Sequence, residues 1–275
     1  MTVTPNVSFI GQALAQSTRL GNMRVQLDDL QRQISTQKKH EDIGGFGGNA
    51  GQIVRLHAST NILQSHLNNI DTARTRIKAM TGLMQKAIDA ARQMKSQIVL
   101  QQANNSTDMS VTNTLGTQLQ ELLRDVLNYD IDGRYLFAGS RSQTLPVSDL
   151  PTLNTNNQTE VTQWLSGAIT TQQLTDNVDA FTTSQLGFDA TLATSGSVTA
   201  HIDTSLEVDY TVIADSSGMD KLMRAFGLAA NLTFPNPATD VPDATDVQAV
   251  LDYIDDLLKD GAAEAEASVQ ELGGQ

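Results

Sequence analysis

The chain contains no cysteine among its 275 residues, which excludes disulfide frameworks, thiolate metal sites and cysteine nucleophiles. It has no apolar run close to the ~20 residues that a membrane-spanning helix needs. Residues 1–12 lack the basic segment and the hydrophobic stretch of a cleaved secretory signal. If the protein is exported, we therefore expect a route without a cleaved signal, and we expect no membrane insertion.

The chain has only 18 lysine and arginine residues against 31 aspartate and glutamate residues, so its formal net charge is −13 and its isoelectric point is near 4.5. Because phosphate binding needs a basic face that releases counterions, nucleic acid is not an expected partner. Aromatic residues are also few, at 4% against 39% hydrophobic residues overall. Most of the core must therefore come from aliphatic side chains and methionine, a composition that favours packed helices.

Proline is absent from residues 6–145, which permits long uninterrupted helices. Near the start, apolar residues alternate in steps of three and four, the heptad pattern of a helix that packs along one seam. We call this set the first seam: Leu20, Met23, Leu27, Leu30 and Ile34. After a glycine-rich connector, residues 44–51, a second seam repeats in sevens over residues 56–98. The second helix extends roughly 65 Å, so an elongated molecule is expected.

A polar turn over residues 102–109 leads into a third amphipathic stripe, residues 115–126, which we expect to pack antiparallel to the second helix. The helical period is lost over residues 140–197, which we interpret as a small separate region. Alternation over residues 206–212 predicts a half-buried strand. The helical period then returns over residues 219–258.

These patterns predict a mainly α fold with a small β-containing insert, in which N- and C-terminal segments form an elongated antiparallel helical bundle. Residues 1–40 form an N-terminal helical region that we expect to be partly disordered in isolation. Residues 41–140 form a long helical hairpin, and residues 141–215 form a surface insert with β-strands. Residues 216–275 form helices that return to the rod.

No cluster of residues predicts catalysis, a metal site or a cofactor. Asp130, Asp132 and Gly133 resemble the start of a calcium-binding loop, but the later acidic ligands and the closing glutamate are missing, so a turn is predicted. The four histidines lack metal-ligand spacing, and no serine lies in a nucleophile elbow. The carboxylates of residues 252–256 are interpreted as the solvated face of a helix.

A motif follows the third stripe: Gly133-Arg134-Tyr135-Leu136-Phe137-Ala138-Gly139. It resembles the Gly-Arg-Tyr-Ile/Leu-Phe-Ala/Ser-Gly motif of flagellar hook-associated proteins of the hook–filament junction, within the flagellin superfamily. In that family the motif leads from a core helix into a variable insert. Residues 30–39 are similar to the flagellin pattern Leu-x-x-x-Ile/Leu-Ser-Ser/Thr-Gly-Lys/Arg, except that Gln37 stands where glycine is expected. Residues 201–226 are similar to the C-terminal side of flagellin-like inserts.

The resemblance implies a structural subunit that connects hook to filament and templates flagellin assembly. It implies signal-independent export through the flagellar type III apparatus, with an export chaperone, to an extracellular position. The implied partners are further copies in a ring or tube, a neighbouring hook-associated protein and flagellin. The first seam would pack subunits together, and the core hinge motif would comprise five residues, Gly133, Arg134, Tyr135, Phe137 and Gly139, whose aromatic rings clamp helix ends and whose glycines supply turns.

Two alternatives stay open. Flagellin itself shares the bundle and the export route, although its usual Gln-Phe-Asn-Gly type of sequence after this helix is absent here. A surface carbohydrate-binding module would need exposed aromatics around Trp164, Phe181 and Phe188, for which a core role is favoured. Members of the superfamily end in a long helix, with leucines near its terminus, that pairs with the first helix. This chain stops at Glu271-Leu272-Gly273-Gly274-Gln275, so we expect that closing segment to have been lost or removed. We therefore expect the first seam to be disordered or packed against another molecule.

Overall fold

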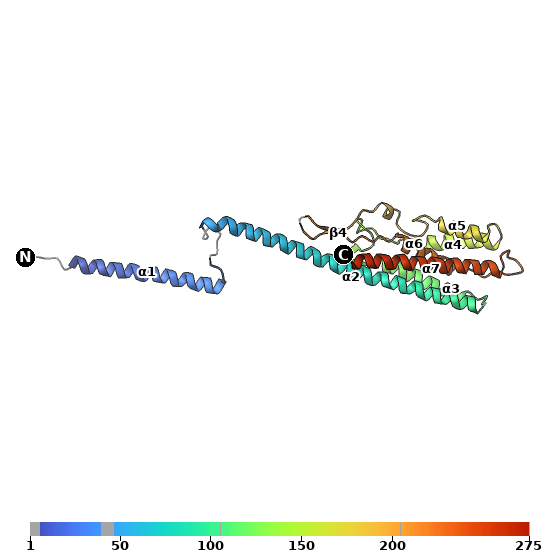
Figure 1. Cartoon of the computed structure of the whole chain (residues 1–275), viewed down its shortest axis with the longest axis horizontal. Helices are drawn as coiled ribbons and strands as arrows, with labels where there is room; N and C mark the ends of the chain where they lie inside the picture. The colour runs from blue at the N-terminus through green and yellow to red at the C-terminus, as the bar shows by residue number, and fades with distance from the viewer. Residues whose placement is uncertain (1–5, 40–46, 105, 204, 275) are drawn as a thin grey trace, which may run out of the picture. The chain divides into compact units, whose positions relative to one another are not determined.

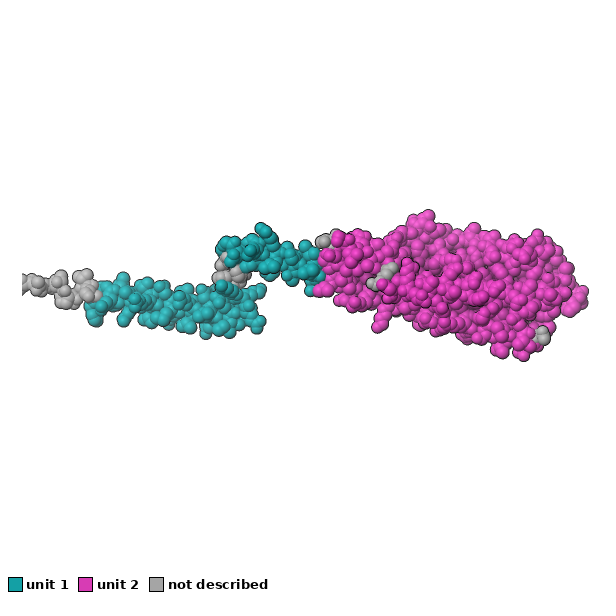
Figure 2. Space-filling view, in the orientation of Figure 1, with its two compact units in different colours: residues 1–65 teal, residues 66–275 magenta. Residues whose placement is uncertain are grey.

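The computed structural model describes residues 6–39, 47–104, 106–203 and 205–274. Its elements are α1 (Asn6–Thr36), α2 (Ala50–Ala103), α3 (Ser110–Leu127), β1 (Asp130–Ile131), β2 (Arg134–Tyr135), α4 (Leu150–Leu165), α5 (Thr171–Asp179), η2 (Leu192–Thr194), β3 (Thr199–His201), β4 (Glu207–Asp209), α6 (Ser217–Asn231) and α7 (Ala244–Gly273) (Figure 1). Contacts divide the chain into two compact units, residues 1–65 and residues 66–275 (Figure 2). The predicted mainly α fold is confirmed. Part of the predicted glycine-rich connector, residues 44–46, lies outside the described residues.

α2 and α3 form a helical hairpin, as the third stripe predicted. α2 ends at Ala103 and α3 begins at Ser110, so the connection falls where the polar residues placed it. Gln101 closes this turn, because its Nε2 donates to the carbonyl oxygen of Ser106 at 2.7 Å. Across the pair, Gln97 Nε2 donates to Thr112 Oγ1 at 3.2 Å.

α7 packs antiparallel to α2. Lys95 Nζ lies 2.7 Å from Asp255 Oδ2, and Arg92 Nη2 lies 2.6 Å from Glu266 Oε1. The partner numbers fall along α7 as they rise along α2, which sets the antiparallel direction. The interpretation of residues 252–256 as a solvated face is therefore wrong for Asp255, whose carboxylate joins the two helices.

α6 lies against both α3 and α7 and is the most buried helix of its unit. Asn113 of α3 caps its C-terminal end, because the Asn113 Nδ2 donates to the carbonyl oxygens of Ala229, Ala230 and Leu232 at 3.1, 3.0 and 2.9 Å. α3 approaches closely at Gly116, where an added Cβ would lie 2.7 Å from the backbone nitrogen of Ala230. Only glycine permits this crossing without a shift.

The core is built largely from aliphatic residues and methionine, as the composition predicted. The second seam is buried over its later part, including Met84, Ala91 and Ile98, whereas Leu56 and Leu63 near its start are exposed. No helix in the described ranges combines the length and apolarity needed to cross a bilayer.

The expected loss of helical structure over residues 140–197 is wrong, because α4 and α5 lie there. The side chain of Asp149 caps α4, and Thr170 with Gln173 forms a capping box on α5. The buried residues of α4 follow a helical period: Leu150, Leu153, Asn157, Val161 and Trp164. Asn157 occupies the central position, and because it is polar, the helical period of the buried residues could not be recognised from hydrophobicity. Both helices belong to the unit of residues 66–275 and share its core.

The predicted strand over residues 206–212 is present but shorter. β4 pairs antiparallel with β3, with Ala200 opposite Val208. The ladder ends at Asp209, whose carboxylate accepts from the backbone N–H and the hydroxyl of Thr211 at 2.9 and 2.5 Å. This local turn competes with further pairing.

Candidate functional site

The motif after α3 begins with a tight β-hairpin. β1 and β2 pair with Asp130 opposite Tyr135. The connecting residues, Asp132 and Gly133, have φ angles of 56° and 72°. Two successive positive φ angles are typical of a type I′ turn, whose twist matches that of the strands it joins. The turn predicted in place of a calcium loop is confirmed, and Gly133 N donates to Asp130 Oδ2 at 3.0 Å.

The hairpin closes the end of α3, as the resemblance implied. Leu136 N donates to the carbonyl oxygen of Tyr129 at 3.0 Å, just beyond the last turn of the helix. The Asn128 side chain exchanges two bonds of 2.8 Å with the backbone of Val147. The start of the insert is therefore bonded directly to the helix end.

The two aromatic residues of the motif differ in burial. Phe137 is fully buried in the core, while Tyr135 is half-buried at its edge. The carbonyl oxygen of Phe137 accepts from Ala214 N at 2.8 Å, which ties the motif to the segment that precedes α6. Phe137 thus packs where the core, the outgoing chain and the returning chain meet.

Gly139 lies where the chain enters the insert and passes the loop of residues 195–196, which precedes β3. Its φ is 57°, and an added Cβ would lie 2.4 Å from Ser195 Oγ and 2.9 Å from the carbonyl oxygen of Gly196. Ser140 N donates to that carbonyl at 2.9 Å, and Ser140 Oγ accepts from Gly196 N at 2.8 Å. Both motif glycines adopt the left-handed backbone that tight turns use. That the chain moves at this joint stays a prediction.

The first seam lies on α1 and is exposed along its whole length. The exposed fractions range from 52% at Leu30 to 77% at Ile34. Phe9, Ile10 and Leu14 continue the exposed apolar surface toward the start of α1. Exposed apolar side chains along one helix are what packing against another molecule would require, and that packing stays a prediction.

α1 ends at the position where the flagellin pattern has glycine. Gln37 follows the last residue of the helix and has a φ of 56°. A left-handed residue directly after a helix is a common termination, and glycine adopts it without strain. The backbone thus retains a glycine-type geometry although the side chain differs.

The remaining polar and charged side chains hold helices together and do not form a metal site among the described residues. No cluster of three or more His, Cys, Asp or Glu residues suited to a metal occurs among the described residues. Arg224 is buried and bonds Asp220 and the carbonyl oxygens of Val178 and Phe181, joining α6 to the end of α5. The spacing of Asp220 and Arg224, four residues apart on one helix, could have predicted this ion pair from the sequence.

Two further contacts perturb side-chain ionisation. Burial and a 2.6 Å hydrogen bond to Asp179 raise the pKa of the Tyr253 phenol well above its ordinary value. The 2.6 Å bond between Lys221 Nζ and Glu264 Oε1 lowers the pKa of Glu264 and raises that of Lys221. These contacts fix α7 against α5 and α6.

A solved structure shares this fold. The chain is similar to a protein described as a "putative flagellar hook-associated protein" from Vibrio parahaemolyticus, with a TM-score of 0.52 and 14% identity over 83% of this chain and 86% of that one. No family model matches the chain, and no curated protein matches it. At this identity the likeness shows the fold: a mainly α arrangement like that of the neighbour.

The aromatics that a carbohydrate-binding module would need are not on the surface. Trp164, Phe181 and Phe188 are 1%, 8% and 3% exposed. The Trp164 indole N–H donates to Thr171 Oγ1 at 3.1 Å, which satisfies its polar group inside the core. This alternative therefore loses the feature on which it depended.

Proposed function

We propose that the protein is a structural subunit of the bacterial flagellum and that it connects the hook to the filament. The observation that carries this proposal is the fold likeness to a flagellar hook-associated protein over 83% of the chain. The motif of residues 133–139 supports it independently, because the sequence resemblance concerns the same family. In the structure these residues close a core helix and open the insert, the place that the family motif occupies.

The exposed first seam supplies the means of assembly. Full burial of a Leu, Ile or Met side chain contributes about 1.5–3 kcal/mol. A seam with five such residues therefore gains several kcal/mol against one neighbour, but ordering and association offset much of this. Stable attachment follows when each subunit contacts several others, as in a ring or tube.

The proposal includes partners and a location. Copies of the chain form the ring or tube, a neighbouring hook-associated protein receives it, and flagellin polymerises on it. Export proceeds through the flagellar type III apparatus with a chaperone, and the assembled subunit is extracellular. The protein acts by assembly and not by catalysis.

Deletion of the gene tests this proposal. Electron microscopy of the deletion strain should show bare hooks, and the culture medium should contain monomeric flagellin. Complementation with the intact gene should restore filaments. Hooks that carry normal or merely altered filaments would contradict the junction role and would favour a filament or minor surface subunit.

A further inference from the structure

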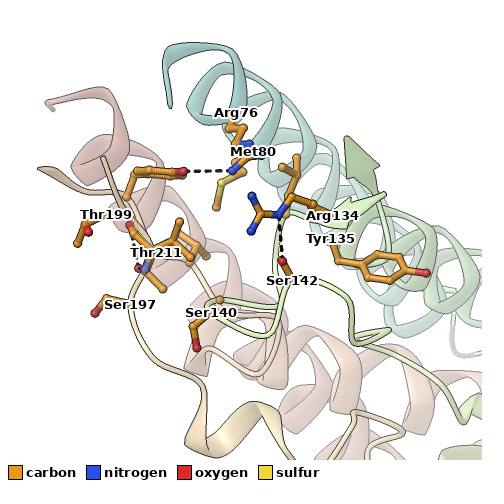
Figure 3. A pocket seen from close by; sticks show the side chains of 14 residues that line it. Arg76, Met80, Arg134, Tyr135, Ser140, Ser142, Ser197, Thr199 and Thr211 are labelled. Carbon is orange, nitrogen blue, oxygen red and sulfur yellow. Dashed lines mark hydrogen bonds between the residues drawn. The ribbon is translucent and has the colours of Figure 1, made fainter. Parts of the chain in front are cut away.

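A pocket of about 230 Å³ lies between α2, the motif hairpin and two segments on the return from the insert, residues 197–199 and 210–212 (Figure 3). Arg76 of α2 and Arg134 of β2 both line it. Most of the other polar residues that line it carry hydroxyl groups, among them Ser140, Ser142, Ser197, Thr199, Tyr210 and Thr211. No aspartate or glutamate is among the residues that line it. This is notable in a chain with 31 acidic and 18 basic residues.

The two guanidinium groups keep most of their hydrogen-bonding capacity. A guanidinium has five N–H donors. Arg76 Nη1 donates to the Tyr210 hydroxyl at 3.5 Å, and Arg134 Nε donates to Ser142 Oγ at 3.1 Å. Neither arginine forms an ion pair within the described ranges, whereas Arg92 and Arg224 do. The pocket therefore holds two positive charges, neither of which has a carboxylate of the described chain within ion-pair distance.

Nearby carboxylates lie in adjoining hollows. Asp71 and Asp132 line a neighbouring hollow that Arg76 also borders. Neither carboxylate lies within ion-pair distance of the Arg76 guanidinium. Asp209 faces a different hollow and accepts two bonds from Thr211. The acidic groups around the pocket are thus placed outside it.

The walls of the pocket are held by backbone bonds. Tyr135 N donates to the carbonyl oxygen of Ser142 at 2.7 Å, which fixes the hairpin side. Tyr210 N donates to the carbonyl oxygen of Val198 at 3.1 Å, which fixes the opposite side. A fixed pocket with unused donors loses little entropy when it binds a ligand.

We propose that this pocket binds an oxyanion between Arg76 and Arg134. Guanidinium groups suit carboxylate and phosphate oxygens, because their planar N–H pairs match two oxygens at once. The hydroxyls of Ser140, Ser142 and Tyr210 accept bonds from N–H groups and keep their own protons, so they can donate to the remaining oxygens. The shared chemistry fits two sources, a free anion or an acidic side chain of a second copy of the chain. The inference stands independently of the proposed function.

The first test measures binding of inorganic phosphate, sulfate and citrate to the full chain by isothermal titration calorimetry. Ionic strength is held constant with sodium chloride, so that general screening does not change. We expect saturable binding of at least one of these anions. Absence of saturable binding by all three, together with absence of the anion-sensitive association described below, would overturn the proposal.

Matched variants locate the binding. Arg76→Gln and Arg134→Gln should each weaken affinity roughly 10- to 100-fold, the size of one lost charge-assisted bond. Arg74→Gln removes the same charge from an exposed position of α2 that does not line the pocket, and affinity should change by less than about twofold. Equal weakening in all three variants would show a general charge effect and would contradict the site.

The second arm distinguishes the two sources by sedimentation velocity in a chloride buffer that contains no phosphate, sulfate or citrate. If a second copy supplies the carboxylate, part of the self-association should disappear when the anion that binds in the calorimetric test is added. The same part should be missing in Arg134→Gln, while Arg74→Gln should associate as the wild-type chain does. If a free anion is the ligand, calorimetric binding is present and association is insensitive to it. Association through the first seam is apolar and should not respond to either change.

Discussion

At the scale of single residues, left-handed backbone positions mark the ends of segments. Gly133 and Gly139 both have positive φ, but their surroundings differ. An added Cβ at Gly133 meets nothing within 4 Å, whereas at Gly139 it would lie 2.4 Å from Ser195 Oγ. Substitution of Gly133 therefore tests backbone strain alone, whereas substitution of Gly139 tests backbone strain together with a steric clash.

Gly139→Ala should destabilise the fold more than Gly133→Ala. Gly133→Ala carries only the conformational cost of about 1–2 kcal/mol. Gly139→Ala adds a steric conflict, for a total of about 2–5 kcal/mol. Urea titration of the full chain measures both, with fluorescence of Trp164 as the signal, because this single tryptophan is buried in the unit of residues 66–275. Equal losses would contradict the tight crossing at Gly139.

The Lys221–Glu264 contact predicts a pH-dependent contribution to stability. The bond from Lys221 lowers the pKa of folded Glu264 below the ordinary value of 4.5. Its contribution is therefore complete above pH 4.5 and is lost as the pH falls through the lower folded value. Glu264→Gln should reduce the free energy of unfolding at pH 7 by up to about 1 kcal/mol, since the pair is partly exposed.

The difference between wild type and Glu264→Gln should narrow as the pH is lowered below 4.5. Urea titrations at several pH values measure it. Glu121→Gln is the control, because Glu121 is exposed and forms no ion pair in the described part of the chain. A difference for Glu264→Gln that stays constant over this range would rule out the ionic origin.

At the scale of elements, the crossing of α3 and α6 depends on Gly116. Gly116→Ala should lower the free energy of unfolding by about 1–3 kcal/mol, because its Cβ would meet the backbone of Ala230. Gly82 is also helical, but an added Cβ there meets nothing. Gly82→Ala should raise the free energy of unfolding by about 0.5–1 kcal/mol. Urea titration with Trp164 fluorescence measures both, and a shift of the same sign in the two variants would contradict this assignment.

The elements that the sequence predicted well are those with uninterrupted apolar periods. The second seam and the third stripe correspond to α2 and α3, and the turn falls between them. α4 was missed because the polar residue Asn157 interrupts its apolar face. Asn157 is nevertheless buried, and its Nδ2 donates to the carbonyl oxygen of Leu153 at 3.0 Å. The capping box of Thr170 and Gln173 on α5 was a readable signal that was not used.

Site geometry was predictable only where local conformation decides it. The Asp132–Gly133 sequence favours a type I′ turn, so the turn could be predicted from two residues, whereas the pairing of β1 with β2 was not predicted. The pocket around Arg76 and Arg134 depends on segments far apart in the chain, including Thr211. No periodic pattern specifies which arginines remain without a carboxylate, because that depends on tertiary contacts.

At the scale of the whole molecule, the proposed assembly gives α1 a packing role that it does not have in the single chain. Leu27→Asp places a charge in the exposed first seam, where Leu27 is 61% exposed. The unfolding transition reported by Trp164 should change by less than about 0.5 kcal/mol. Assembly should fail, because burial of an unpaired carboxylate between subunits is costly.

Complementation of the deletion strain measures this effect. Asn22→Asp is the matched control, because it introduces the same charge on α1 outside the first seam. Leu27→Asp should leave cells without filaments although the protein reaches the medium, and Asn22→Asp should restore filaments. Restoration by both variants would show that the first seam does not pack subunits together.

The most direct measurement is immunogold electron microscopy of isolated flagella, with antibody raised against the full chain. A junction subunit should be labelled in a narrow band where hook meets filament and nowhere else. Label along the whole filament would contradict the junction role and indicate flagellin, and absence of label from flagella that carry filaments would contradict a flagellar role altogether.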